Sequence, residues 1–103
     1  MYNEKRRPHY DLRAFQAAFA RRNGRTMTAS AWTSAMLMGF SPDGVCAVIE
    51  SMLPGHFYKS MTANAEHDVW QDVYHVPFAG ICLYVKFTKD RVADFRLLSF
   101  KEK

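Results

Sequence analysis

The sequence has 103 residues, of which 49% are hydrophobic and 15% aromatic, with a formal net charge of +4 at pH 7. This size predicts a single domain, residues 1–103, with enough apolar material for one core. The apolar stretches are too short to span a membrane, and no apolar run follows the basic start, so we expect a soluble, unexported, cytoplasmic protein without a membrane partner. A basic excess favours polyanionic partners only slightly, because many soluble proteins are mildly basic.

Three amphipathic helices are predicted in the first half of the chain. From Asp11, apolar residues recur at helical spacing until the stop signal Asn23-Gly24. Thr28 is a candidate cap of a second helix that ends at Gly39. Ser41-Pro42-Asp43 combines a cap, a first-turn proline and an acid near the positive helix end, which predicts the start of a third helix.

After Pro54-Gly55 the apolar period changes to two, which is the period of a strand. Four strands are expected, over residues 57–62, 69–76, 81–88 and 92–100, with short connections at 63–65, 77–80 and 89–90. Short connections imply antiparallel neighbours. The predicted fold class is therefore α+β, with N-terminal helices packed on one face of an antiparallel sheet and the other face available to a ligand. Residues 8–10 are a candidate short edge strand.

Metal and disulfide chemistry is not expected. The four histidines lack the close spacing or the partner cysteines of a zinc site. They are His9, His56, His67 and His75. Cys46 and Cys82 are too few for a disulfide scaffold and are interpreted as small buried hydrophobes in a reducing compartment. No phosphate-binding glycine loop or nucleophile elbow is present, so catalysis would need no metal, cofactor or covalent intermediate.

The polar residues of the predicted strands suit RNA. Cleaving RNA without a metal requires deprotonation of the 2′-hydroxyl, a cation beside the phosphate and an acid for the departing 5′ oxygen. Candidates for these roles are Lys59, Gln71, Tyr74, His75, Tyr84, Lys86 and Lys101, with Tyr58 and Trp70 as stacking surfaces. Each also has a structural interpretation, since strand lysines are commonly solvated and strand aromatics commonly belong to the core.

Several motifs together closely resemble the MqsR family of bacterial toxins. The motifs are Phe57-Tyr58-Lys59-Ser60-Met61-Thr62, His67 three residues before Trp70-Gln71-Asp72-Val73-Tyr74, Tyr84-Val85-Lys86, and the closing Ser99-Phe100-Lys101-Glu102-Lys103. The register extends upstream through Glu4-Lys5-Arg6 and Pro8-His9, so the resemblance covers nearly the whole chain.

The resemblance implies an mRNA interferase, the toxin half of a type II toxin–antitoxin pair, with a fold like the RelE and YoeB ribonucleases. Family members cleave messenger RNA without the ribosome and prefer a short GC-containing trinucleotide. The implied catalytic residues are Lys59, Gln71 and Tyr84. Tyr58, Met61 and Lys101 also lie in matching motif positions and are implied as supporting residues. Trp70, His75 and Lys86 are further RNA-binding candidates because of the chemistry of their side chains. The implied partners are mRNA and a cognate antitoxin, with no cofactor and with DNA contacted only through the antitoxin.

One departure and two alternatives accompany this interpretation. His75 stands where the best-known family member has arginine, and a histidine can shuttle protons where an arginine only holds a phosphate. The first alternative is a catalytically silent module that binds an antitoxin or RNA. The second is a DNA-binding regulator, suggested by the basic helix with Arg13, Arg21 and Arg22, although no helix-turn-helix is evident.

Overall fold

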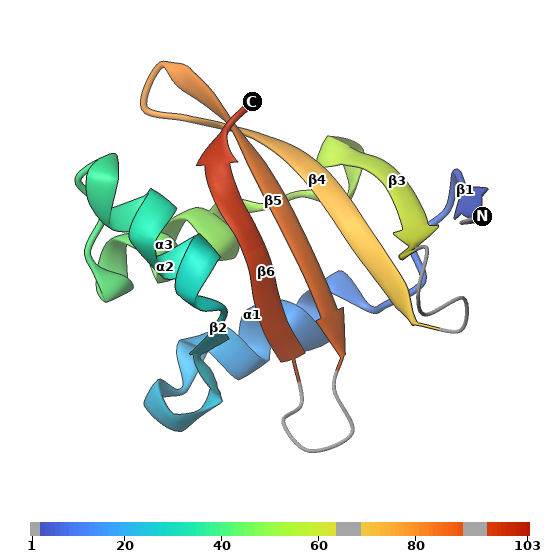
Figure 1. Ribbon diagram of the computed structural model, residues 1–103, viewed down its shortest axis with the longest axis horizontal. Helices are drawn as coiled ribbons and strands as arrows, with labels where there is room; N and C mark the ends of the chain where they lie inside the picture. The colour runs from blue at the N-terminus through green and yellow to red at the C-terminus, as the bar shows by residue number, and fades with distance from the viewer. Residues whose placement is uncertain (1–2, 64–68, 90–94) are drawn as a thin grey trace.

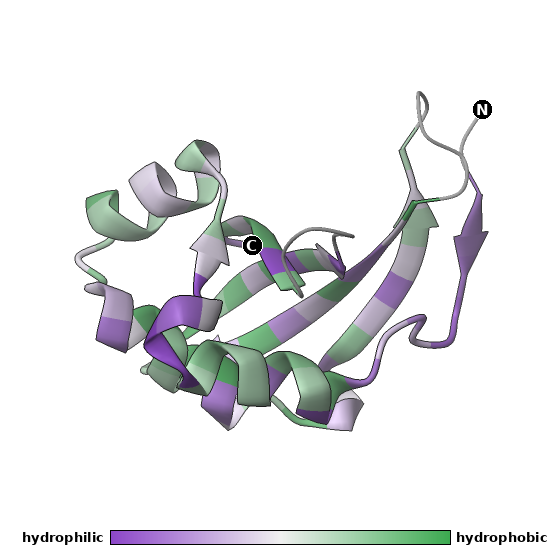
Figure 2. Cartoon of the chain, turned by 90° about the horizontal axis from the view of Figure 1, so that it is seen from below, coloured by the Kyte–Doolittle hydropathy of each residue, from purple (hydrophilic) through white to green (hydrophobic). Residues whose placement is uncertain are grey.

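The computed structural model describes residues 3–63, 69–89 and 95–103, and these form an α+β fold (Figure 1). The elements in chain order are β1 (Glu4–Lys5), α1 (Leu12–Ala20), β2 (Thr26–Met27), α2 (Ala29–Leu37), α3 (Pro42–Ser51), β3 (Phe57–Thr62), β4 (Trp70–Phe78), β5 (Ile81–Lys89) and β6 (Phe95–Glu102), with short 3-10 turns at Arg22–Gly24 and Pro54–His56. The strands form one six-stranded sheet in the order β1-β3-β4-β5-β6-β2. The helices lie on one side of this sheet (Figure 2).

The predicted helix starts are confirmed by their caps. The side-chain oxygens of Asp11, Thr28 and Ser41 each accept a hydrogen bond from a backbone N–H in the first turn of the helix that follows. Gly39, two residues after α2, has a φ of 88°, a conformation that other residues rarely adopt. Within the described part of the chain, no helix combines the length and the apolar character needed to cross a membrane.

The core lies between the helices and the inner face of β4, β5 and β6. At its centre, Phe15 of α1 stacks on Phe87 of β5 with ring centroids 3.7 Å apart and an interplanar angle of 6°. Val76, Leu83 and Val85 extend this apolar layer along the sheet. Burying such side chains supplies most of the stabilising free energy of a domain of this size.

The expectation of a purely antiparallel sheet is wrong at one edge. β2, which the sequence analysis does not predict, pairs with β6 in parallel, with Thr26 beside Arg96 and Met27 beside Leu97. A strand of two residues is too short to produce a recognisable alternation of polar and apolar side chains. Its place in the sheet follows from the packing of α2, whose cap Thr28 donates from Oγ1 to the backbone oxygen of Leu98 at 3.0 Å.

The N-terminal edge strand lies closer to the start of the chain than the expected residues 8–10. Residues 8–10 do not pair in the sheet, whereas β1 pairs antiparallel with β3. The backbone N–H groups of His9 and Tyr10 instead donate to the buried carboxylate of Asp72 at 2.9–3.1 Å. Ser60 Oγ donates to the same carboxylate at 2.6 Å. Asp72 therefore fixes the N-terminal arm, which we define as residues 3–11, against the sheet.

The strand bounds differ from the predicted ones mainly at turns. Residues 77 and 78, expected in a connection, belong to β4, so the hairpin turn is Ala79-Gly80, with φ values of 50° and 84°. β5 ends one residue later than predicted and β6 continues to Glu102. Residues 92–94 of the predicted last strand, and residues 64, 65 and 90 of the predicted connections, lie outside the described residues.

Candidate active site

The predicted alternation along β5 separates two faces of the sheet. Leu83, Val85 and Phe87 are buried in the core, so the side chains between them point to the face turned away from the helices. Tyr84 and Lys86 are half-buried on this second face, which we call the outer face. Residues that pair across antiparallel strands share a face, so the pairing register identifies the other members of the outer face.

Aromatic rings and a lysine cross four strands of the outer face in one row. Tyr58 of β3 stacks on His75 of β4, with ring centroids 4.2 Å apart and an interplanar angle of 21°. The ring of His75 lies 6.0 Å from that of Tyr84, its pairing partner on β5. Tyr84 pairs in turn with Lys101 of β6, whose Nζ lies 5.1 Å from the centre of the Tyr84 ring. We call these four residues the aromatic row.

Lysines gather beside the aromatic row. Lys59 of β3 and Lys86 of β5 both pair with Val73 of β4, one from each side. Burial lowers the pKa of Lys86, and the cations of Lys101 and Lys59 lower it further. We call Lys59, Lys86 and Lys101 the lysine cluster. Lys86 lies close enough to the other two cations to be repelled by both, and a bound anion would relieve this repulsion.

A β-bulge in β3 brings two consecutive side chains to the outer face. The pairing of β3 with β4 shifts register between Phe57 and Lys59. Phe57 packs against the core, whereas Tyr58 and Lys59 both lie on the outer face, with Lys59 Nζ 5.5 Å from the centre of the Tyr58 ring. In a regular strand these neighbours would point in opposite directions. The bulge thus places a ring and a cation side by side.

Gln71 and Met61 flank the lysine cluster on the side away from the aromatic row. They pair with each other across β3 and β4, one step beyond the pair of Lys59 with Val73. Both are half-buried. The structure therefore brings Lys59, Gln71 and Tyr84 to one face. Along the strands, Lys59 lies between the level of Gln71 and the level of Tyr84.

Two of the aromatic candidates lie on the helix side of the sheet. Trp70 alternates with Gln71, and its ring stacks on His9 at 5.4 Å with Lys5 Nζ 4.2 Å from the ring centre. Tyr74 is buried in the core, and burial raises the pKa of its phenol to about 12. The structure does not bring either ring to the lysine cluster. His67, part of one motif, lies outside the described residues.

The protonation states of His75 and Tyr84 follow from burial. Burial lowers the pKa of His75 below its ordinary 6.5, and the charge of Lys103 acts in the same direction. Burial raises the pKa of the Tyr84 phenol, while the cation of Lys59 opposes that shift. At neutral pH the imidazole is thus mainly unprotonated and able to accept a proton, and the phenol is protonated and able to donate one.

Glu4 also reaches this site, although in the sequence it stands out only as part of the upstream motif Glu4-Lys5-Arg6. Its Oε1 lies 2.5 Å from Lys59 Nζ, and this hydrogen bond lowers the pKa of the Glu4 carboxyl. The two residues are 55 positions apart, so no spacing rule relates them. Glu4 and Lys59 meet because β1 pairs with β3, and this pairing cannot be recognised from the sequence.

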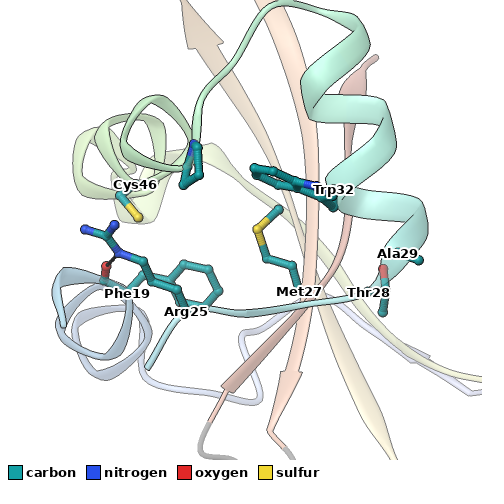
Figure 3. Close-up of a pocket in the computed structure, with 8 residues that line it drawn as sticks. Phe19, Arg25, Met27, Thr28, Ala29, Trp32 and Cys46 are labelled. Carbon is teal, nitrogen blue, oxygen red and sulfur yellow. Dashed lines mark hydrogen bonds between the residues drawn. The ribbon is translucent and has the colours of Figure 1, made fainter. Parts of the chain in front are cut away.

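A cavity of about 480 Å³ lies apart from the outer face, on the helix side (Figure 3). Its wall is mainly apolar and includes Phe19, Met27 and Trp32. The cation at its edge, Arg25, is paired with Asp43 at 2.9 Å. Among the residues with described positions, no group of three or more His, Cys, Asp and Glu side chains could hold a metal ion.

Comparison with known proteins identifies the family. The family model described as "Motility quorum-sensing regulator, toxin of MqsA" matches residues 7–102. The mRNA interferase toxin MqsR of Escherichia coli (strain K12) is 39% identical over 100 residues, which cover 97% of this chain and 99% of that protein. A match of this extent, over both the helices and the strands that carry the outer face, establishes that the chain belongs to the MqsR toxin family.

Proposed function

We propose that this protein is an mRNA interferase toxin of a type II toxin–antitoxin system, an endoribonuclease that cleaves single-stranded mRNA without a metal or the ribosome. The observation that carries the proposal is the convergence of the lysine cluster with His75 and Tyr84 on the outer face. This arrangement offers a cation, a proton acceptor and a proton donor, the three groups needed for metal-free cleavage of RNA. The relative named an mRNA interferase toxin supports the same activity.

The proposed reaction is attack of the 2′-hydroxyl on the adjacent phosphorus. His75 accepts the proton of the 2′-hydroxyl, the 2′ oxygen forms a bond to phosphorus, and the bond to the 5′ oxygen breaks. Tyr84 donates its proton to the departing 5′ oxygen, and Lys59 stabilises the negative charge that accumulates on the phosphate. The products are a 2′,3′-cyclic phosphate and a 5′-hydroxyl.

The remaining outer-face residues are proposed to hold the RNA. Lys86 and Lys101 attract the neighbouring phosphates, and Gln71 hydrogen-bonds a base edge or a phosphate oxygen. Tyr58 and Met61 supply apolar contact to an unstacked base. Trp70 can take part only where the RNA passes round the edge of the sheet, because its ring faces the other side.

Two substitutions, one in each partner, test this proposal. Replacing the 2′-hydroxyl of the cleaved nucleotide by hydrogen should abolish cleavage, because the attacking oxygen is missing. Lys59→Ala should lower kcat/KM by about 10²- to 10³-fold, as for other lost electrostatic contacts to a developing charge. Lys89→Ala is a matched control, since Lys89 is exposed and its Nζ lies beside Phe95 rather than in the lysine cluster.

The measurement is cleavage of labelled single-stranded RNA by purified protein in the presence of a chelator, followed by analysis of the new ends. Cleavage of the 2′-deoxy analogue at the normal rate would rule out the reaction. RNA that is bound but left intact by the wild-type protein would favour a catalytically silent binding module instead.

We further propose that a cognate antitoxin protein binds this toxin in the cytoplasm and that the complex contacts DNA through the antitoxin. The described fold is α+β with one six-stranded sheet, and we propose that this single toxin domain, residues 1–103, is related to the ribonuclease fold of RelE and YoeB. A gel shift of operator DNA by the toxin alone would contradict the proposed role of the antitoxin.

A further inference from the structure

We propose that Glu4 is an internal competitor for the substrate phosphate at Lys59, so that RNA binding replaces one anion by another. This inference rests on the proposed function, in which Lys59 holds the scissile phosphate. It concerns a residue that lies outside the catalytic set and that reaches the site from the edge of the sheet. The consequence is a toxin whose RNA affinity is held below the value that its lysine cluster alone would give.

The backbone of the N-terminal arm holds Glu4 in place. Glu4 pairs with Met61 in the β1–β3 ladder, so its side chain shares the outer face with Met61 and Lys59. On one side, Asn3 and Thr62 exchange two hydrogen bonds, at 2.8 and 2.9 Å. On the other, Arg6 donates to the backbone oxygen of Tyr58 at 3.4 Å. The contact with Lys59 is therefore positioned by the sheet rather than by a freely moving surface side chain.

The two partners differ in exposure. The side chain of Lys59 is 19% exposed, whereas that of Glu4 is 36% exposed. A carboxylate oxygen at the Lys59 ammonium occupies the same kind of position that a phosphate oxygen would take, since both are anionic acceptors. Solvent screens the more exposed carboxylate, so the pair contributes little stability and an incoming phosphate can displace it.

Glu4 is the acid through which the lysine cluster is already partly neutralised. Among the acidic residues with described positions, Asp11 caps α1, Asp43 pairs with Arg25, and Asp72 is buried on the helix side. Glu50 is exposed on α3, and Glu102, exposed at the end of β6, pairs with the core residue Leu83 and so lies on the helix side. Within this described set, the ion pair between Glu4 and Lys59 brings a negative charge to the site.

Competition predicts a specific kinetic pattern. Removing the charge of Glu4 makes phosphate binding easier in the ground state and in the transition state alike, so KM falls while kcat stays within about twofold. Because an exposed ion pair is weak, the gain in affinity is expected to be at most about fivefold. The gain should shrink as added salt screens the charges.

The test compares Glu4→Gln with Glu50→Gln, which removes the same charge from a helix remote from the outer face. A fluorescein-labelled single-stranded RNA with 2′-fluoro riboses, which cannot be cleaved, reports affinity by fluorescence anisotropy, and unmodified RNA reports kcat and KM. We expect Glu4→Gln to bind about two- to fivefold more tightly at low salt and Glu50→Gln to bind like the wild type. In the Lys59→Ala background, Glu4→Gln should change affinity by less than about twofold, because the group for which it competes is absent.

Each other outcome overturns the inference in a recognisable way. Unchanged or weaker binding by Glu4→Gln, with normal cleavage by the wild type, refutes competition and leaves the proposed function intact. Equal gains with and without Lys59 mean that Glu4 merely repels RNA. A fall in kcat of tenfold or more marks Glu4 as a group that takes part in the reaction. A wild-type protein that neither binds nor cleaves RNA refutes the proposed function, and the inference falls with it.

Discussion

His75 occupies the middle of the aromatic row, between Tyr58 and Tyr84. Its imidazole is partly withdrawn from solvent, and both burial and the nearby Lys103 charge disfavour the protonated form. An arginine at this position would add a permanent cation beside the lysine cluster. Histidine instead provides a group that changes charge near neutral pH.

The lowered pKa of His75 predicts how the rate of cleavage changes with pH. If the neutral imidazole accepts the 2′-hydroxyl proton, kcat/KM falls as the pH drops through the pKa of His75, in a range below 6.5, and stays constant above it until the Tyr84 phenol ionises at alkaline pH. Cleavage by His75→Gln should be slower, and its kcat/KM should no longer fall in this acidic range. The measurement is the pH–rate profile of both proteins.

Acid also acts on the folded state, so the profile needs a control. A histidine whose pKa is lowered by folding binds its proton more readily in the unfolded chain, and stability therefore also falls as the pH drops through the same range. Circular dichroism at each pH separates this effect from catalysis. An identical acidic limb in His75→Gln would exclude His75 as the proton acceptor.

The sequence allowed the residues of the candidate site to be named, but it did not show, for every side chain, which face it occupies or which residues contact it. Alternation along β5 placed Tyr84 and Lys86 on one face, as the structure confirms. Trp70 was expected as a stacking surface because rings bind bases, yet alternation along β4 turns its ring to the other side of the sheet. Glu4 was missed because its contact with Lys59 depends on a strand pair that joins residues 55 positions apart.

At the scale of the elements, the hairpin between β4 and β5 supports most of the outer face. Its two-residue turn, Ala79-Gly80, has positive φ at both positions. Gly80 adopts this conformation without strain, whereas Ala79 has a Cβ that crowds the backbone there. The hairpin therefore carries a local cost that is unrelated to the chemistry of the site.

Relieving this cost should stabilise the protein. Ala79→Asn creates the Asn-Gly sequence preferred in such turns and should raise the free energy of unfolding by about 0.5–1 kcal/mol. Ala79→Val, with a branched Cβ, should lower it by a similar amount or more. Urea denaturation of the three proteins measures both changes. Equal stability of Ala79→Asn and Ala79→Val would contradict the role assigned to the turn.

Helices and long strands were predictable because their signals are local. Side-chain caps at Asp11, Thr28 and Ser41 lie next to the backbone groups that they satisfy. β2 was not predictable, because two residues have no period and their partner strand begins nearly 70 positions later in the chain, with Thr26 opposite Arg96. Similarly, the bulge that places Tyr58 beside Lys59 arises from the pairing of β3 with β4 rather than from β3 alone.

Over the whole molecule, the two sides of the sheet have different characters. The inner side carries the apolar core and is covered by the helices, and hydrophobic and hydrophilic residues alternate along the strands (Figure 2). The outer side carries the lysine cluster, and the chain has a formal net charge of +4. A polyanion approaching the molecule is therefore favoured in general and held at one face in particular.

This distribution predicts the salt dependence of RNA binding. If each lysine of the cluster contacts one phosphate, the logarithm of the association constant should fall against the logarithm of salt concentration with a slope of about −2, since each contact on a single strand contributes about −0.7. Lys101→Gln should make the slope shallower by about 0.7, and Lys89→Gln should leave it unchanged. Titrations at several salt concentrations measure the slopes. Equal effects of the two substitutions would mean that binding depends on total charge only.

The position of β6 in the sheet has a consequence during translation. Although β6 comes last among the described strands, it lies inside the sheet, between β5 and the parallel β2. A nascent chain that has not yet released residues 95–102 from the ribosome therefore lacks a central strand and has no Lys101 beside Tyr84. Residues 95–102 must therefore leave the ribosome before the proposed RNA-binding surface can assemble, and a shorter nascent chain lacks the complete surface.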